Sequence, residues 1–259
     1  MKMNGNTILI TGGGSGIGRG LAEGFHKLGN KVIIAGRRKD VLDQTTSANP
    51  GMSSLSLDID DPAAILAFSK KVVAEYPALN VLINNSGIMR LEDLVNHPED
   101  LSVPEATITT NLLGPIRLTS ALLPHLTKQS QPVIMNVTSG LAFAPLAFAP
   151  VYCATKAALH SWTESLRYQL GRTGIQVIEL PPPYVQTELT GSRQTSDPLA
   201  MPLHDFIAEA MQILQSQPDV TEVLVENVKP QRFAAQSGTE GYNALVKEFN
   251  DAIAKMMPA

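Results

Sequence analysis

Three residues in the middle of the chain, Ser139, Tyr152 and Lys156, carry side chains that suit proton transfer to an oxygen atom. Tyr152 and Lys156 are four positions apart, so on a helix the phenol and the ammonium share one face. Ser139 precedes this pair, and Asn111 lies further upstream. A phenol has an ordinary pKa of about 10, and a nearby ammonium stabilises its phenolate. The pair alone is also common on solvated helix surfaces, so its meaning depends on what surrounds it.

A glycine-rich segment, TGGGSGIG, occupies residues 11–18 between a predicted strand and a predicted helix. Backbone N–H groups at the start of such a helix, together with the helix dipole, favour a pyrophosphate. Gly18 would let the helix pack closely on the sheet. A flexible turn is the alternative, but the position at the first strand–helix turn favours a dinucleotide. We predict cofactor contacts from Gly12, Gly14, Ser15, Gly16, Ile17 and Gly18.

The second predicted strand indicates which dinucleotide binds. An NAD site usually carries a carboxylate about 20 residues beyond the glycines, where it holds the ribose 2′-hydroxyl. Here the strand ends in Gly36-Arg37-Arg38, without an acid. Two guanidinium groups suit a 2′-phosphate, so NADP(H) is the predicted cofactor, although Lys39 also makes this a candidate for a solvated basic turn.

The third predicted strand ends at Asp58 and Ile59, which we include among the cofactor-binding residues. The carboxylate of Asp58 can accept a hydrogen bond from the adenine amine. It can equally cap the helix that is predicted to begin at Pro62. The sequence leaves both roles open.

Short apolar runs alternate with helical patterns along the whole chain. This alternation predicts an α/β fold: a Rossmann-type, doubly wound parallel sheet in three layers, forming a single domain over residues 1–259. We further expect a substrate loop at about residues 187–210 and a C-terminal helical extension at about 220–257. The predicted strands span residues 7–10, 31–36, 53–59, 79–87, 132–140 and 175–183, and the predicted helices include 17–28, 37–48, 62–76, 151–171 and 203–216.

The composition of the chain argues against several classes of protein, including nucleic-acid-binding and membrane-spanning proteins. The 259 residues carry a formal net charge of −4, which argues against a nucleic-acid partner. No apolar run reaches the length of a membrane span, and the apolar run near the N-terminus is too short for a signal peptide. The single cysteine, Cys153, fits a reducing compartment and predicts a cytoplasmic location. The five histidines, including His97 and His160, lack metal-ligand spacing, so no metal site is expected.

These motifs together resemble the short-chain dehydrogenase/reductase family. TGGGSGIG, NNSG, Asn111, Ser139 and YCATK occur in the order and at the spacings of that family, over essentially the whole chain. The resemblance implies that Tyr152 is the general acid/base and that Ser139 orients the carbonyl. It implies that Lys156 binds the nicotinamide ribose and lowers the pKa of Tyr152. Asn111 would hold a water that passes protons to solvent through Lys156.

The resemblance also implies further contacts. Asn85 and Gly87 would line the cofactor cleft, and the Val185 N–H and the Thr187 hydroxyl would hold the nicotinamide carboxamide. The chain departs from the family at Pro183, where glycine is usual, so the backbone near the nicotinamide is expected to be stiffer. The family implies a homodimer or homotetramer, built partly on the helix that carries Tyr152.

The expected activity is hydride transfer between NADP(H) and a small-molecule carbonyl or secondary alcohol. A non-catalytic NADP-binding regulator of the same fold is the main alternative. A non-redox relative such as a halohydrin lyase fits less well, because those enzymes replace the lysine and lose the glycine loop, and this chain keeps both. The apolar residues 141–150 are expected to form either one wall of a substrate pocket or simple core packing.

Overall fold

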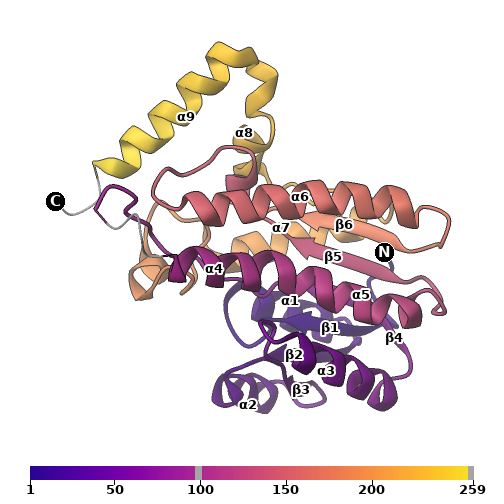
Figure 1. The fold of residues 1–259 in the computed structure, drawn as a ribbon. Helices are drawn as coiled ribbons and strands as arrows, with labels where there is room; N and C mark the ends of the chain where they lie inside the picture. Colours follow the sequence, from indigo (N-terminus) through magenta and orange to yellow (C-terminus); the bar gives the residue numbers. More distant parts are fainter. Residues whose placement is uncertain (97–100, 256–259) are drawn as a thin grey trace.

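The computed structural model describes residues 1–96 and 101–255. One parallel sheet of six strands lies at its centre, in the order β3-β2-β1-β4-β5-β6 (Figure 1). The chain runs outward from β1 to β3 and then returns to the other side of β1, so the sheet is doubly wound, as predicted. The strands are β1 (Thr7–Thr11), β2 (Lys31–Gly36), β3 (Ser53–Ser56), β4 (Leu79–Asn84), β5 (Val133–Val137) and β6 (Gln176–Leu180).

Helices cover both faces of the sheet, which gives the predicted three layers. Along β1, Ile8 and Ile10 point into one apolar core and Leu9 points into the other, as the alternation of side chains on a strand requires. β1, β4 and β5 are buried along their whole length, which is typical of a parallel sheet covered on both faces.

Different helices build the two cores. The first core contains Phe25 of α1 (Gly16–Lys27), Leu42 of α2 (Lys39–Ala48) and Phe206 of α7 (Leu203–Ser216). The second core is covered by the helices in front of the sheet in Figure 1. These are α3 (Pro62–Glu75), α5 (Gly114–Leu126) and α6 (Pro150–Leu170). The short helix α4 (Ser102–Ile108) precedes α5 in the chain.

Several predicted strands extend too far at their carboxyl ends. β3 ends at Ser56 rather than at residue 59, and β4 ends at Asn84 rather than at residue 87. The residues after β3 and β4 do not continue the hydrogen bonding between strands, because their backbone groups bond to other partners. The Asn85 N–H, for example, donates to the Thr11 hydroxyl at 3.0 Å. After β6, three prolines cannot donate to a neighbouring strand.

The predicted loop over residues 187–210 is irregular only as far as Pro202. α7 begins at Leu203, because Phe206, Ala210 and Leu214 form a buried stripe at helical spacing that packs in the same core as α1. Before it lies only the short 3-10 turn η3 (Ser192–Ser196).

The predicted helical extension over residues 220–257 begins as extended chain. Glu222 bridges to Glu179 beside β6, and helical structure starts only with η4 (Glu226–Val228) and α8 (Lys229–Arg232). After η5 (Ala234–Ser237) comes α9 (Gly238–Ala254), which projects away from the sheet in Figure 1. The last two residues of the predicted extension lie outside the described residues. Within the described part of the chain, each helix is too short or too polar to cross a membrane.

The α1–α7 layer gives a direct test of the fold. Phe206 is completely buried, so Phe206→Ala should remove about 3–5 kcal/mol from the free energy of unfolding through lost burial and the cavity left behind. Leu199→Ala, at an exposed position just before α7, should change it by less than about 0.5 kcal/mol. Urea denaturation of both variants measures the difference, and equal effects would contradict the placement of α7.

Candidate active site

The four predicted catalytic residues meet at the carboxyl edge of the sheet. Ser139 follows β5, and Tyr152 and Lys156 lie in the first two turns of α6. The Ser139 hydroxyl lies close enough to the Tyr152 phenol to act on its pKa, and the Lys156 Nζ lies 5.7 Å from the centroid of the Tyr152 ring. A Cβ added to Gly87, after β4, would lie 3.3 Å from Asn111 Oδ1 and 3.7 Å from Lys156 Nζ. All four side chains are buried.

Ser139 is held by the chain that surrounds it. Its hydroxyl oxygen accepts a hydrogen bond from the Leu141 N–H at 3.1 Å, at the start of the short turn η2 (Gly140–Ala142). The Gly140 N–H donates to the Pro182 carbonyl at 2.8 Å, which joins this turn to the end of β6. The hydroxyl is therefore fixed in position beside the phenol.

Lys156 is a buried ammonium. It donates a hydrogen bond to the Val137 carbonyl at the end of β5, at 2.8 Å. Burial lowers the pKa of Lys156 to about 8, and the carboxylate of Glu179 opposes that shift. The side chain is therefore mostly protonated at neutral pH and titrates just above it.

The pKa of Tyr152 differs from the expectation. Burial raises the pKa of the phenol to about 12, while the hydrogen bond with Ser139 acts to lower it. The net shift in the protein alone is upward, because the loss of solvation around the phenol outweighs the effect of Ser139, and the expected lowering by Lys156 stays a prediction. Tyr152 is a protonated phenol throughout the physiological pH range.

Asn111 lies in η1 (Thr109–Leu113), a π-helical segment between α4 and α5. Pro115 has no N–H, so it cannot donate to the Asn111 carbonyl as an α-helix requires. The Asn111 side chain accepts from the Ile88 N–H and donates to the Ile88 carbonyl, both at 2.8 Å. The side chain thus holds the segment after β4, while the backbone carbonyl lacks its α-helical donor.

The glycine loop has the shape of a phosphate cradle. Gly12 has a φ of +65°, and a Cβ added to Gly18 would lie 2.3 Å from the Gly12 carbonyl oxygen. Ser15, at the N-cap of α1, makes no side-chain capping bond, and the first turn contains no acidic residue. The backbone N–H groups there suit an anion. These features fit the pyrophosphate of a dinucleotide.

The predicted cofactor residue Asn85 supports this loop rather than standing free beside it. Its amide Nδ2 donates to the carbonyls of Thr11 and Gly12, at 3.0 and 3.3 Å. The Ser86 N–H also donates to the Thr11 hydroxyl at 3.1 Å. The end of β4 is therefore tied to the start of the glycine loop.

The two arginines after β2 have different partners. Arg38 donates to the Ser15 hydroxyl at 3.1 Å, which places its guanidinium against the glycine loop. Arg37 forms an ion pair with Asp60 at 2.9 Å, and its side chain is about half exposed. Of the two, Arg38 is the better placed to meet a phosphate beside the loop.

At the end of β3, the structure excludes one of the two roles left open for Asp58, the capping of α3, and the adenine contact stays a prediction. The carboxylate that caps α3 belongs to Asp61, which accepts from the Ala63 N–H at 2.7 Å, so Asp58 is not the cap. Asp58 is exposed and accepts from the Asp60 N–H at 3.1 Å. Ile59 is buried against Gly114, so its side chain serves the core.

Three side chains that support the site were not predicted from the sequence. Gln194 donates to the Val185 carbonyl at 2.7 Å and to the Thr187 hydroxyl at 3.1 Å, which holds Thr187 beside Gly16. Glu92 accepts from the Val151 N–H at 3.0 Å, at the start of α6. Glu179 lies buried in β6. Gln194 lies in the short turn η3 and Glu92 in an irregular segment, both without a motif, and the signal for Glu179 was a charge in an apolar strand.

The apolar segment over residues 141–150 fits both interpretations in part. Leu146 and Ala149 are buried in one cluster with Tyr152. Other residues of the segment line a cavity of about 440 Å³ together with α6 and α9, and its walls include Leu141, Pro145, Cys153, Tyr242 and Val246. Ser139 and Tyr152 do not line this cavity, so it lies beside the reacting centre rather than at it.

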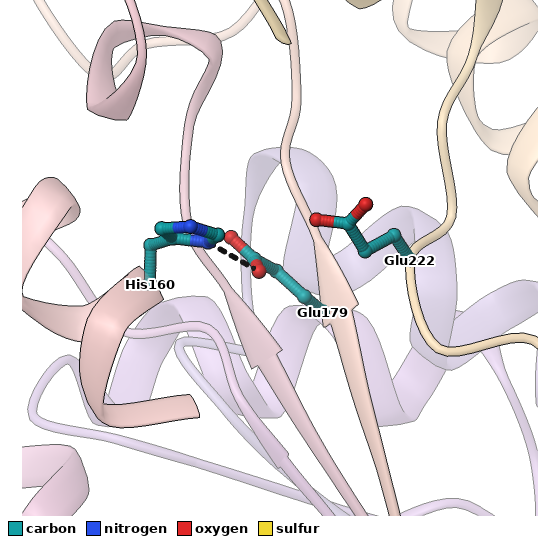
Figure 2. Close-up of side chains that lie close together, drawn as sticks. All are labelled: His160, Glu179 and Glu222. Atoms are coloured by element: carbon teal, nitrogen blue, oxygen red, sulfur yellow. Dashed lines mark hydrogen bonds and ion pairs between the residues drawn. The ribbon is translucent and has the colours of Figure 1, made fainter. Parts of the chain in front are cut away.

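One group of side chains has the composition of a metal site. His160, Glu179 and Glu222 bring ligand atoms within 4.8 Å of one another (Figure 2). However, Arg232 pairs with both carboxylate oxygens of Glu222, at 2.9 and 3.1 Å. Glu179 accepts from Thr138 at 2.6 Å and is bonded to His160 Nδ1 at 2.8 Å. The group is therefore an ion-pair network whose oxygens are already satisfied. His97 lies outside the described residues.

Comparisons with known proteins agree with this geometry. The family model of short chain dehydrogenases matches residues 6–198. The oxidoreductase DltE of Bacillus subtilis (strain 168) is 47% identical over 189 residues, which covers 73% of this chain and 75% of that protein.

Two solved structures share the fold. A short-chain dehydrogenase from Sphingobium yanoikuyae in complex with NADPH has a TM-score of 0.77 and 26% identity, and the match covers 92% of this chain and 95% of that one. A 3-ketoacyl-(acyl-carrier-protein) reductase from Brucella melitensis, complexed with NADH, has a TM-score of 0.75 and 27% identity, with 85% and 96% covered. This chain belongs to the short-chain dehydrogenase/reductase family of oxidoreductases and resembles DltE.

Proposed function

We propose that this protein transfers a hydride between NADP(H) and a carbonyl or secondary alcohol, with Tyr152 as the general acid/base. The observation that carries the proposal is the grouping of the buried Ser139 hydroxyl, Tyr152 phenol and Lys156 ammonium at one place, with Lys156 Nζ 5.7 Å from the centroid of the Tyr152 ring. These groups lie at the sheet edge that also carries the glycine loop. The bound nicotinamide supplies or accepts the hydride.

The phenol and the serine hydroxyl act on the substrate oxygen. A carbonyl oxygen gains negative charge as hydride arrives at its carbon, and positioned donors stabilise that charge. Ser139 is fixed by its backbone contacts, and Tyr152 is protonated because its pKa is about 12. Tyr152 is therefore ready to donate a proton in the reducing direction. The Lys156 ammonium then stabilises the resulting phenolate.

Asn111 and Lys156 provide the route by which Tyr152 regains a proton. In this proposal the Asn111 carbonyl, deprived of its α-helical donor by Pro115, binds a water next to Lys156. Protons pass from solvent through this water and Lys156 to the phenolate. The proximity of Gly87, Asn111 and Lys156 supports that route.

The cofactor assignment rests on a few contacts. Backbone N–H groups from Gly12 to Gly18 would hold the pyrophosphate, and Arg38 with Ser15 would hold the 2′-phosphate. The two solved relatives contain NADPH in one case and NADH in the other, so the preference for NADP(H) depends on the arginines. Further contacts are assigned to Arg37, Asp58, Ile59, Asn85, Gly87, Lys156, Val185 and Thr187.

The remaining assignments follow from the family and the composition. A non-catalytic NADP-binding regulator stays the alternative, but it gives no role to the buried Ser139, Tyr152 and Lys156 set. We propose a homodimer or homotetramer that uses the outer face of α6, where the Tyr168 side chain is 90% exposed. A cytoplasmic location follows from the single cysteine.

Replacing Tyr152 tests the catalytic role. Tyr152→Phe removes the proton donor but keeps the ring, so kcat for ketone reduction should fall by about 10²–10⁴-fold while the Kd for NADPH stays unchanged. Steady-state kinetics and fluorescence titration with NADPH measure the two effects. A variant that keeps most of its activity would contradict the role of Tyr152.

Replacing the arginines tests the choice of cofactor. Arg38→Ala should weaken NADPH binding by roughly 10–100-fold, the value of a lost charge-assisted hydrogen bond, and leave NADH binding nearly unchanged. Arg37→Ala is the matched control and should have a smaller effect, because Arg37 is engaged with Asp60. Equal weakening of both cofactors by Arg38→Ala would refute the 2′-phosphate assignment.

The pH dependence of reduction tests the role of Lys156. The ammonium is present below its pKa of about 8 and is lost as the pH rises through that value. Reduction should therefore be fastest on the acidic side and decline above pH 8, as measured by kcat from pH 6 to 10. A rate of reduction that increases across this range would contradict the account.

A further inference from the structure

Glu179 is a carboxylate placed inside the protein. It is the fourth of the five residues of β6 and is completely buried, while Val177, Ile178 and Leu180 of the same strand supply apolar side chains to the cores. A buried charge is costly unless cations and hydrogen-bond donors surround it. The groups that surround Glu179 therefore indicate its purpose.

Both oxygens of this carboxylate bond to neighbours of the active site. Oε1 accepts from the Thr138 hydroxyl at 2.6 Å, and Thr138 directly precedes Ser139. Oε2 is bonded to His160 Nδ1 at 2.8 Å, and His160 lies one helical turn beyond Lys156 on α6 (Figure 2). The hydrogen bond to Glu179 raises the pKa of His160, which favours a charged pair.

The backbone brings the same carboxylate close to Lys156. The Lys156 ammonium bonds to the Val137 carbonyl, and Val137 pairs with Leu180, the residue after Glu179. Glu179 and Lys156 thus lie on the face of the sheet that α6 covers. Glu179 raises the pKa of Lys156 against the effect of burial.

We propose that Glu179 is a positioning residue that, held by Thr138 and His160, keeps Lys156 in its charged form beside Tyr152. It acts through its electric field and does not touch the substrate. The inference rests on the proposed function in one respect: the charge on Lys156 matters for turnover because it stabilises the phenolate of Tyr152.

Other charged groups near this network balance one another. Glu222 is neutralised by its two bonds with Arg232, and Arg232 stacks on the Phe143 ring at 4.8 Å. The His160 ring also contacts the Phe143 ring, in a T-shaped arrangement with the centroids 4.8 Å apart, and His160 lies 3.9 Å from the exposed Glu164. Among the described residues, Glu179 is therefore the carboxylate that acts on Lys156, and the uncharged Tyr152 and Asn111 also lie beside this ammonium.

Glu179→Gln tests this assignment, because glutamine keeps the shape and can still accept from Thr138 but lacks the charge. In ketone reduction with NADPH, the pH at which kcat falls on the alkaline side should be lower by roughly one pH unit than in the wild-type enzyme. That shift lowers kcat about five-fold at pH 8 and leaves it nearly unchanged at pH 6. Glu222→Gln is the matched control in the same network, and its alkaline limb should stay at the wild-type position.

Two results would overturn the proposal. One is a folded Glu179→Gln enzyme with the wild-type alkaline limb. The other is an equal loss of kcat at every pH, which would indicate a purely structural role.

A second measurement keeps the proposal independent of turnover. NMR of protein labelled with ¹³C at the lysine ε-carbons follows the titration of Lys156 directly, with the resonance assigned by its loss in Lys156→Met. The midpoint should be lower in Glu179→Gln than in wild type, and identical midpoints would refute the proposal. If the wild-type protein reduces no ketone but the midpoint still shifts, the proposed function fails while the coupling between Glu179 and Lys156 stands.

Discussion

The site depends on an ammonium group that the fold buries. Lys156 is 4% exposed, and its loss of solvation lowers its pKa to about 8. Its charge survives at neutral pH because the Val137 carbonyl accepts a hydrogen bond from the ammonium and the Glu179 carboxylate raises its pKa. β5, β6 and α6 must be in register for these three groups to meet. The same contacts fix Tyr152 one turn earlier, so the electrostatics and the geometry of the site share one origin.

The doubly wound sheet explains why this centre faces a cofactor loop. Successive strands are added on one side of β1 as far as β3 and on the other side from β4 onward, so the strand order reverses between β1 and β4. At such a switch point a ligand-binding crevice lies outside the carboxyl ends of the strands. The glycine loop leaves β1 and the Asn85 segment leaves β4, and the Asn85 amide joins them. Ser139 leaves β5 at the same edge. The residues that directly follow the carboxyl ends of these strands therefore form the site.

Sequence reasoning predicted the fold because the apolar runs and helical periods agree with each other along the whole chain. It predicted Ser139, Tyr152 and Lys156 because their order and spacing form a motif. It missed Gln194, whose contacts lie within one loop, and Glu92, whose partner Val151 is distant in the sequence, because neither residue belongs to a recognisable pattern. It also assigned Tyr152 a lowered pKa, because a sequence shows the neighbouring lysine but not the extent of burial. The helix predicted over residues 203–216 is α7, so the predicted substrate loop at about 187–210 overlaps its first residues.

The most direct test of the central claim is the absorbance of NADPH at its nicotinamide band during incubation with a panel of ketones and aldehydes. The account predicts that the absorbance falls with at least one carbonyl compound. It further predicts that the fall requires the protonated phenol of Tyr152 and the charged Lys156. Tight binding of NADPH without consumption by any compound of the panel would contradict the account and favour a cofactor-binding regulator.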